Sequence, residues 1–270
     1  MTAILTDIHG NIRALEAVLA DLPPQTQQIW TLGDTAGGGP FPADCINRLI
    51  QSPLPVTGVL GNWEAQLLSL RDNPNAIIAS TQSSLRWTAD NLQPEHWTYL
   101  ENLPTSAAVG DALLYHASPD DVLTGITSRE NAAAIAQKHP QKWLISGHVH
   151  KTQLYRFGEQ TVVTVGSVGL SADGIGGMAT YAVLDGERMS LRHVMYDAEA
   201  AISAFHASPY GQFIEPYISR AYVSTLRTGE NWLAKFFEHM QIDARKKHGT
   251  TPDALTPAQW EEIANGFAGA

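Results

Sequence analysis

The first sixty residues alternate between short apolar runs and segments with helical periodicity. Each apolar run stops at a polar residue, as residues 3–6 do at Asp7, which is typical of a buried strand. Between the runs, apolar positions such as Ile12, Leu15 and Val18 recur at helical spacing. We therefore expect strands over 3–6, 28–32 and 55–60 and helices over 12–22 and 43–50. This order predicts βαβ units with parallel strands in an α/β fold.

Beyond residue 60 the pattern changes twice. Helical spacing predicts helices over 63–72, 76–91 and 94–101, and apolar runs predict strands over 112–115 and 143–146. Residues 152–195 are predicted to form a β-meander with glycine-rich turns. After Tyr196 amphipathic stretches predict helices near 197–206, 213–226, 229–241 and 256–266, with a break at 209–211 and a polar connection over 243–253.

The change of pattern after Tyr196 divides the chain. Residues 1–196 contain all the predicted strands and form the expected main domain. Residues 197–270 are expected to be a helical extension of it, because about 70 residues build only a small core by themselves. Such an extension could close over a site as a lid or form the interface of a homodimer.

Composition and charge restrict the class of protein. A formal net charge of −10 on 270 residues argues against binding to duplex nucleic acid, which depends on Lys and Arg. It allows a phosphorylated small substrate, because metal ions can supply local positive charge. No apolar run approaches the roughly 20 residues of a membrane helix, and the N-terminus has no basic region typical of a signal peptide. The single Cys45 excludes an internal disulfide and fits a cytoplasmic location.

Residues whose side chains can bind metal ions follow the predicted strands. They combine carboxylates, imidazoles and one amide, and comprise Asp7, His9, Asp34, Asn62, His116, His148 and His150. Open α/β sheets place their ligands at the carboxyl ends of strands. A mixture of oxygen and imidazole ligands suits Mn, Fe or Zn. One shared carboxylate would suffice to hold two ions roughly 3.5–4 Å apart, the spacing used for displacement at phosphorus.

The series DIHGN, GD, GN, H and GHVH resembles the calcineurin-like metallophosphoesterases over about residues 3–190. The segments 116-HASP-119 and 166-GSVG-169 are similar to those of a small prokaryotic phosphodiesterase branch. The resemblance implies a four-layer αββα sandwich of two mixed β-sheets flanked by helices. It makes 1–196 the catalytic domain, with the site at one edge of the sandwich.

The resemblance also implies a dinuclear centre with two divalent or mixed-valence ions of Mn, Fe or Zn. One ion would be held by Asp7, His9, Asp34 and His150, and the other by Asp34, Asn62, His116 and His148. A hydroxide bridging the ions would be the nucleophile. Asp34, Asn62 and His148 would act most directly in catalysis.

Trp63 stands where this family usually has a histidine that protonates the leaving group. An indole has no useful acid chemistry, and general acid catalysis is worth about 10²- to 10⁴-fold when an alkoxide leaves. A phosphate leaving group, with a pKa near about 6, hardly needs that help. Trp63 therefore favours a phosphoanhydride substrate, and its ring could stack on a nucleobase. The alternative is that Trp63 caps the following helix and packs in the core.

A GNWE sequence in place of GNHE is similar to that of asymmetric diadenosine tetraphosphate hydrolases, which form ATP and AMP. The resemblance thus implies a phosphodiester or phosphoanhydride hydrolase of nucleotides. A protein serine/threonine phosphatase, a nuclease or a general phosphodiesterase is the alternative within enzymes. A non-catalytic metal-binding scaffold is disfavoured because all seven ligand positions are filled.

Three further polar residues lie beside the ligand segments. Arg13 and Lys151 are candidate phosphate contacts. Asn11 could orient Asp34 or a phosphate oxygen, or could instead begin the helix that follows it.

Overall fold

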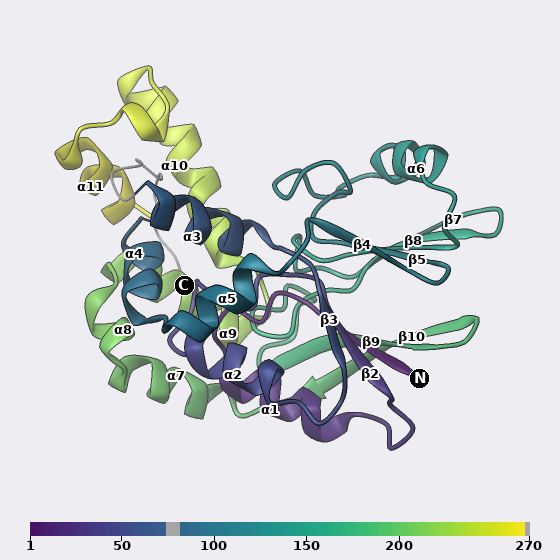
Figure 1. The fold of residues 1–270 in the computed structure, drawn as a ribbon. Coiled ribbons are helices and arrows are strands. Elements are labelled where there is room, and N and C mark those ends of the chain that lie inside the picture. Colours follow the sequence, from purple (N-terminus) through teal and green to yellow (C-terminus); the bar gives the residue numbers. More distant parts are fainter. Residues whose placement is uncertain (74–81, 268–270) are drawn as a thin grey trace.

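The computed structural model, which describes residues 1–73 and 82–267, has two five-stranded β-sheets that face each other (Figure 1). The first sheet has the order β10-β9-β1-β2-β3 and the second β4-β5-β6-β8-β7. The strands of the first sheet are β1 (Thr2–Leu5), β2 (Gln28–Thr31), β3 (Val56–Gly58), β9 (Met178–Asp185) and β10 (Arg188–Met195). Those of the second are β4 (Ser106–Val109), β5 (Ala112–Tyr115), β6 (Trp143–Ser146), β7 (Gln153–Phe157) and β8 (Gln160–Thr164).

Both sheets are mixed. In the first, β1, β2 and β3 are parallel, with Ala3 opposite Ile29 and Ile29 opposite Val56, and β9 and β10 join antiparallel to β1. In the second, β5, β6 and β8 are parallel, while β4 and β7 pair antiparallel at the edges. The predicted βαβ order and the class of two mixed sheets with flanking helices are confirmed.

The strands bury both of their faces. Ile4 and Leu32 point between the sheets, where they meet Ile145 of β6 in one apolar core. Ala3 and Leu5 point outward and are covered by α1 (Ile12–Asp21). Because both faces are buried, these strands appear in the sequence as continuous apolar runs rather than alternating ones.

Helices cover the outer faces and one end of the sandwich (Figure 1). The first sheet carries α1 and α2 (Pro42–Ile50), and the second carries α6 (Arg129–Lys138). The helices α3 (Asn62–Asp72), α4 (Gln82–Asn91) and α5 (Pro94–Glu101) pack together beside α2. Part of the helix expected over 76–91 lies outside the described residues, and α4 accounts for the rest.

Within the described part of residues 1–196, β4 and α6 were not predicted. Helix α6 buries only small residues, Ala132 and Ala136 among them, so its apolar periodicity is weak in the sequence. Its stronger signal is Ser128, whose side chain accepts a hydrogen bond from the backbone N–H of Asn131 and caps the helix. Strand β4, with the sequence SAAV, is equally poor in large apolar residues.

The predicted β-meander over 152–195 is wrong in its topology. All four strands exist, but β7 and β8 form a hairpin in the second sheet, and β9 and β10 form a hairpin in the first. The chain crosses between the sheets after β8, because β8 pairs with β6 and β9 pairs with β1. This crossing places the segment 165–177 at the end of the sandwich.

The residues after 196 are helical, as expected. They form α7 (Ala198–Ala207), α8 (Pro209–Phe213), α9 (Pro216–Thr228), α10 (Trp232–His248) and α11 (Pro257–Asn265). The expected break at 209–211 begins the short α8 instead, capped by Ser208. Helix α10 also continues through most of the expected polar connection and ends at Gly249, which adopts a left-handed conformation (φ 65°).

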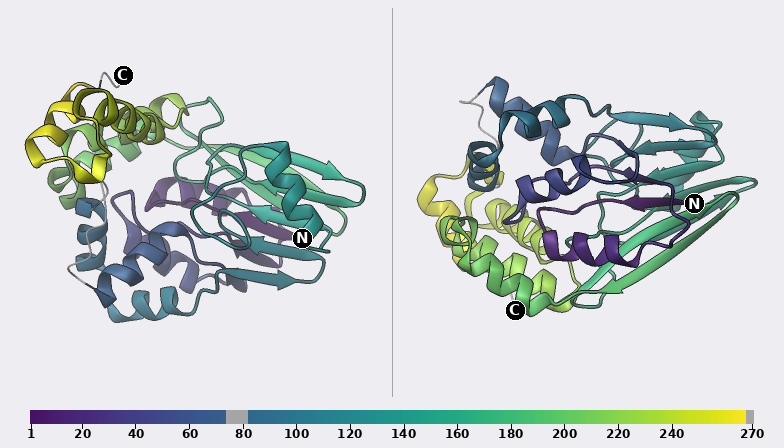
Figure 2. Two further views of the ribbon diagram at one scale, coloured as in Figure 1. Left: turned by 90° about the horizontal axis from the view of Figure 1, so that it is seen from above. Right: turned by 60° about the horizontal axis from the view of Figure 1, so that its bottom comes forward.

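The C-terminal helices gather at the end of the sandwich where α3 and α4 lie (Figures 1 and 2). They share a core of their own around Phe205, Tyr222 and Phe236, and this core includes Leu170 of the inter-sheet crossing. Across residues 1–73 and 82–267, no helix is long and apolar enough to span a bilayer.

Replacement of Leu15, a residue of α1 that is 0% exposed, tests the packing of this helix on the first sheet. We expect Leu15→Ala to lower the free energy of unfolding by about 2–5 kcal/mol, because it removes buried methyl groups and leaves a cavity. Leu123→Ala is the matched control, since Leu123 is 61% exposed, and should change it by less than about 0.5 kcal/mol. Urea unfolding measures both, and equal effects would contradict the assigned packing.

Candidate metal centre

The seven predicted ligand residues all follow the carboxyl ends of strands that pair in parallel. Asp7 and His9 follow β1, Asp34 follows β2, Asn62 follows β3, His116 follows β5, and His148 and His150 follow β6. The structure brings all seven together at the end of the sandwich. The common strand direction explains why residues so distant in sequence converge there.

Five of these residues have an unusual backbone conformation. Positive φ angles of 48–71° occur at Asp7, His9, Asp34, His148 and His150, and at no other non-glycine residue in the described part of the chain. The left-handed region is strained for such residues, by roughly 1–2 kcal/mol each. Backbone hydrogen bonds between the turns hold it in place, including His9 N–H to the Asp34 carbonyl at 2.9 Å. Strain of this kind concentrates at functional sites.

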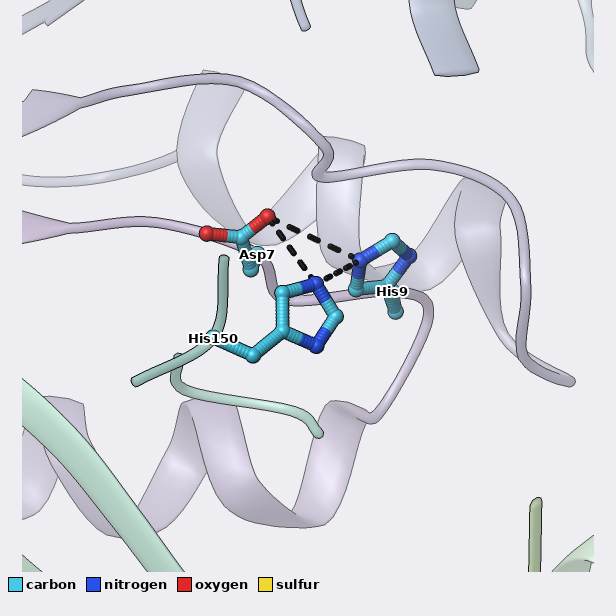
Figure 3. A group of neighbouring side chains, drawn as sticks. All are labelled: Asp7, His9 and His150. Carbon is cyan, nitrogen blue, oxygen red and sulfur yellow. Dashed lines mark hydrogen bonds and ion pairs between the residues drawn. The ribbon is translucent and has the colours of Figure 1, made fainter. Parts of the chain in front are cut away.

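Asp7, His9 and His150 form a first group, shown in Figure 3. The Nε2 atoms of His9 and His150 are 3.1 Å apart. The Asp7 Oδ1 atom lies 3.2 Å from Nε2 of His150 and 3.7 Å from Nε2 of His9. Three potential ligand atoms therefore point at one another from two separate turns.

Asn62, His116 and His148 form a second group. The Asn62 Oδ1 atom lies 2.9 Å from Nε2 of His116 and 3.0 Å from Nδ1 of His148. The two imidazole nitrogens are 3.2 Å apart. His148 therefore presents Nδ1 to the group, whereas His116 presents Nε2.

Asp34 lies between the two groups. Its Oδ2 atom is 3.7 Å from Nε2 of His9 and 3.3 Å from Nε2 of His116. Its other oxygen, Oδ1, accepts a hydrogen bond from the backbone N–H of Trp63 at 2.9 Å. Asp34 is thus the carboxylate best placed to be shared by two ions.

Backbone carbonyls fix the tautomers of three histidines. Nδ1 of His9 contacts the Gly37 carbonyl at 3.1 Å, Nδ1 of His116 contacts the Leu32 carbonyl at 2.7 Å, and Nδ1 of His150 contacts the Leu170 carbonyl at 3.0 Å. Since a carbonyl can only accept, each Nδ1 carries a proton, and Nε2 is the nitrogen that faces the site and can bind a metal ion once it is deprotonated. This is the arrangement usual for metal-binding imidazoles.

The charge balance of the site calls for cations. Burial alone would raise the pKa values of Asp7 and Asp34, but the neighbouring imidazoles outweigh it and hold both below the ordinary range. Conversely, burial would lower the pKa of His116, yet the Asp34 carboxylate raises it to about 10. In addition, the buried Asp7 Oδ1 has no hydrogen-bond donor. Divalent ions would satisfy this oxygen and the converging lone pairs, so the residues fit a metal centre.

Glu64 supports the centre and was missed by the sequence analysis. It is fully buried, and its carboxylate accepts hydrogen bonds from the backbone N–H groups of Asp34 (2.8 Å), Gly61 (3.0 Å) and Ala36 (3.0 Å). Burial and the charge of Asp34 raise its pKa to about 7. A glutamate three residues after a helix N-cap is a capping-box signal, so the sequence did contain a clue.

Trp63 lies beside the first group. Its ring meets the ring of His9 edge-on, with centroids 6.0 Å apart and planes at 82°. It also covers Gly37 so closely that a Cβ there would be 2.4 Å from Cε3 of the indole. The rest of the ring packs against the core of α3 and α4. Core packing, one of the two predicted roles, is therefore the one this structure displays.

The remaining predicted substrate contacts lie outside the two groups. Asn11 is buried and takes the helix-start role, accepting from Ala14 N–H at 3.1 Å and donating to the Gly169 carbonyl at 2.9 Å. Arg13 is exposed and lines a separate hollow with Phe41. Lys151 is exposed directly after His150.

Comparison with known proteins agrees with this geometry. The family model described as "Calcineurin-like phosphoesterase superfamily domain" matches residues 1–189. Protein MJ0912 of Methanocaldococcus jannaschii is 26% identical over 222 residues, covering 74% of this chain and 90% of that protein. A symmetrical bis(5'-nucleosyl)-tetraphosphatase of Glaesserella parasuis is 28% identical over 142 residues, covering 50% of this chain and 52% of that enzyme.

A solved structure shares both the fold and part of the sequence. The metallophosphoesterase from Sphaerobacter thermophilus superposes with a TM-score of 0.70 at 26% identity, covering 84% of this chain and 98% of that one. The family match spans both sheets apart from residues 190–195 of β10, and it contains all seven residues of the candidate centre. This chain therefore belongs to the calcineurin-like phosphoesterase superfamily.

Proposed function

We propose that this metal-dependent phosphoesterase hydrolyses phosphodiester or phosphoanhydride bonds of nucleotides, with a dinucleoside polyphosphate such as diadenosine tetraphosphate as its preferred substrate and ATP and AMP as products. The observation that carries the proposal is Trp63. It occupies the position next to Asn62 where a leaving-group acid is expected, and it is held there against Gly37.

The seven residues would hold two ions. One would be bound by Asp7, His9, Asp34 and His150, and the other by Asp34, Asn62, His116 and His148. When bound, two such ions acidify a water and neutralise phosphate charge. Manganese, iron or zinc suits this donor set.

The chain itself supplies preorganisation. Glu64 ties the backbone of Asp34 to that of Gly61, so the turns after β2 and β3 stay at a fixed separation. The Asp7 carboxylate is oriented by Thr6 Oγ1 at 2.8 Å and by His148 N–H at 2.9 Å, both donating to Oδ2. Its Oδ1 atom is thereby left free to face the site. Groups fixed in this way need little reorganisation when the reaction takes place.

The leaving group decides how much an acid matters. An alkoxide is strongly basic, and its departure gains about 10²- to 10⁴-fold from a general acid. A nucleotide phosphate, whose pKa is near about 6, leaves readily without a proton. A site with an indole at this position therefore favours anhydride cleavage.

The relative from Glaesserella parasuis supports the substrate class, because it is named as a bis(5'-nucleosyl)-tetraphosphatase. Its name describes symmetrical cleavage, whereas the GNWE sequence of this chain favours asymmetric cleavage. The products thus distinguish the two modes of cleavage.

The second candidate function is that of a general phosphodiesterase or protein phosphatase. Our proposal also includes a cytoplasmic location, a homodimer, and residues 197–270 as an extension of the catalytic domain.

Product analysis with Mn²⁺ tests the substrate. We expect diadenosine tetraphosphate to yield equimolar ATP and AMP, with a kcat/KM about 10²-fold above that for an unactivated dialkyl phosphodiester, because an alkoxide needs a proton in order to leave and a nucleotide phosphate does not. Asp34→Asn is the inactive control. An intact dinucleotide together with turnover of a phosphoprotein would refute the proposal, and two ADP molecules would refute the asymmetric mode.

Trp63→His tests the leaving-group argument. The new imidazole should raise kcat/KM on alkyl phosphodiesters by about 10²-fold or more, while anhydride cleavage should not gain. Trp63→Phe is the control, since it keeps an aromatic ring without an acid. Equal gains on both substrate types would show that Trp63 does not select by leaving group.

Metal binding should release protons. The pKa of His116 is raised to about 10 from an ordinary value of 6.5, so at pH 7.5 its imidazole retains a proton that an ion must displace. Metal affinity should therefore rise with pH. In the metal-free protein, the stabilisation from protonated His116 is fully present below pH 6.5 and is lost as pH rises towards 10.

Calorimetric titration of Mn²⁺ in two buffers of different ionisation enthalpy measures this release. About one proton should come from His116 per protein, and His116→Gln should release correspondingly fewer. Identical heats in both buffers would contradict a protonated His116 in the metal-free protein.

A further inference from the structure

We propose that the C-terminal helices α8–α10 position one half of the metal centre, by fixing the backbone carbonyls that orient His150 and His9. Leu170 is the principal positioning residue. This inference rests on the ligand assignment of the proposed function but makes a separate claim, that only the ion of the first group depends on the C-terminal helices.

The inter-sheet crossing over 165–177 holds His150 at two points. The Leu170 carbonyl accepts from Nδ1 of His150 at 3.0 Å, and Ala172 N–H donates to the His150 carbonyl at 2.9 Å. The side chain of Leu170 is 2% exposed and packs in the core of the C-terminal helices. The position of this carbonyl therefore depends on that core.

Helix α9 fastens the same segment further along. Gly177 N–H donates to the Leu226 carbonyl at 2.9 Å, and Gly174 N–H donates to the Gly229 carbonyl at 2.8 Å. Between them, Gly176 approaches so closely that a Cβ would lie 1.8 Å from the Arg227 carbonyl oxygen. The end of α9 and the inter-sheet crossing are therefore bound directly to each other.

The C-terminal helices also lie near the loop that orients His9. The Gly37 carbonyl accepts from Nδ1 of His9, and Gly37 lies so close to Trp63 that an added Cβ would be 2.4 Å from the indole. Trp63 and Gly38 line a cavity of about 30 Å³ together with side chains of α8, α9 and α10, namely Tyr210, Ile218, Leu233 and Phe237. A space of that size holds about one water molecule, so little room separates these helices from the indole and the loop.

The second group has a different support. Nδ1 of His116 is held by the Leu32 carbonyl, and Leu32 is buried in the core between the two sheets. The ring of His148 is backed by Gly125, where a Cβ would be 2.8 Å from Cδ2. None of the buried residues of that inter-sheet core belongs to the C-terminal helices in the described chain. Loosening these helices should thus disturb the first group alone.

Calorimetric Mn²⁺ titration in two backgrounds tests the inference. The pair His116→Ala and His148→Ala leaves only the first group, and the pair His9→Ala and His150→Ala leaves only the second. Leu170→Ala is then added to each. Leu49→Ala is the matched control, because Leu49 is a buried leucine of α2 (1% exposed) that packs in the core on the outer face of the first sheet.

We expect Leu170→Ala to weaken Mn²⁺ binding by about 10- to 100-fold in the first-group background, the usual effect of losing the partner that orients a ligand. Binding in the second-group background should not change, and Leu49→Ala should change neither. Phe237→Ala, at a partly buried residue of α10, provides a second and milder variant. It should also weaken Mn²⁺ binding in the first-group background, through Trp63.

The contrary outcomes separate this inference from the proposed function. Equal weakening of both backgrounds by Leu170→Ala, or weakening by Leu49→Ala as strong as by Leu170→Ala, would overturn the inference and leave the ligand assignment standing. A wild-type protein that binds fewer than two equivalents of Mn²⁺ would overturn both.

Discussion

Two buried carboxylates, Asp7 and Asp34, set the terms for the rest of the structure. Both are almost completely removed from water, and their ion-pair partners among the described residues are histidines. Taking a carboxylate out of water is costly unless positive charge and hydrogen bonds compensate. Imidazoles with their lone pairs turned inward compensate only if they carry protons or if cations lie between them. The turns at this end of the sandwich hold the imidazoles and carboxylates close enough for protons or cations to compensate the buried negative charge.

The scaffold contributes rigidity rather than further charge. Left-handed turns at five of the seven residues aim short side chains inward, and these turns persist because neighbouring turns exchange backbone hydrogen bonds. The buried carboxylate of Glu64 accepts hydrogen bonds from three backbone N–H groups and so links the turns after β2 and β3. A flexible site with the same residues would bind ions more weakly, because the ordering of the ligands would have to take place on binding.

Trp63 connects the chemistry of the site with the C-terminal helices. In the proposed function it takes the place of an acid and favours leaving groups that need no proton. The same ring lies close to Gly37 and lines a cavity with side chains of α8, α9 and α10. In our proposals, Trp63 thus bears both on the choice of substrate and on the link between the C-terminal helices and the first group.

The sequence by itself determined that the first strands are parallel and which residues are the candidate ligands. Both follow from local patterns, because apolar runs end at polar residues and the direction of a strand fixes where its end lies. It could not assign 152–195 to two sheets, because strand pairing depends on partners more than 100 residues away, such as β1 for β9. Nor could it reveal α6, whose buried face consists of alanines, or the tautomers of His9, His116 and His150. Those depend on where the carbonyls of Gly37, Leu32 and Leu170 point, and only tertiary packing decides that direction.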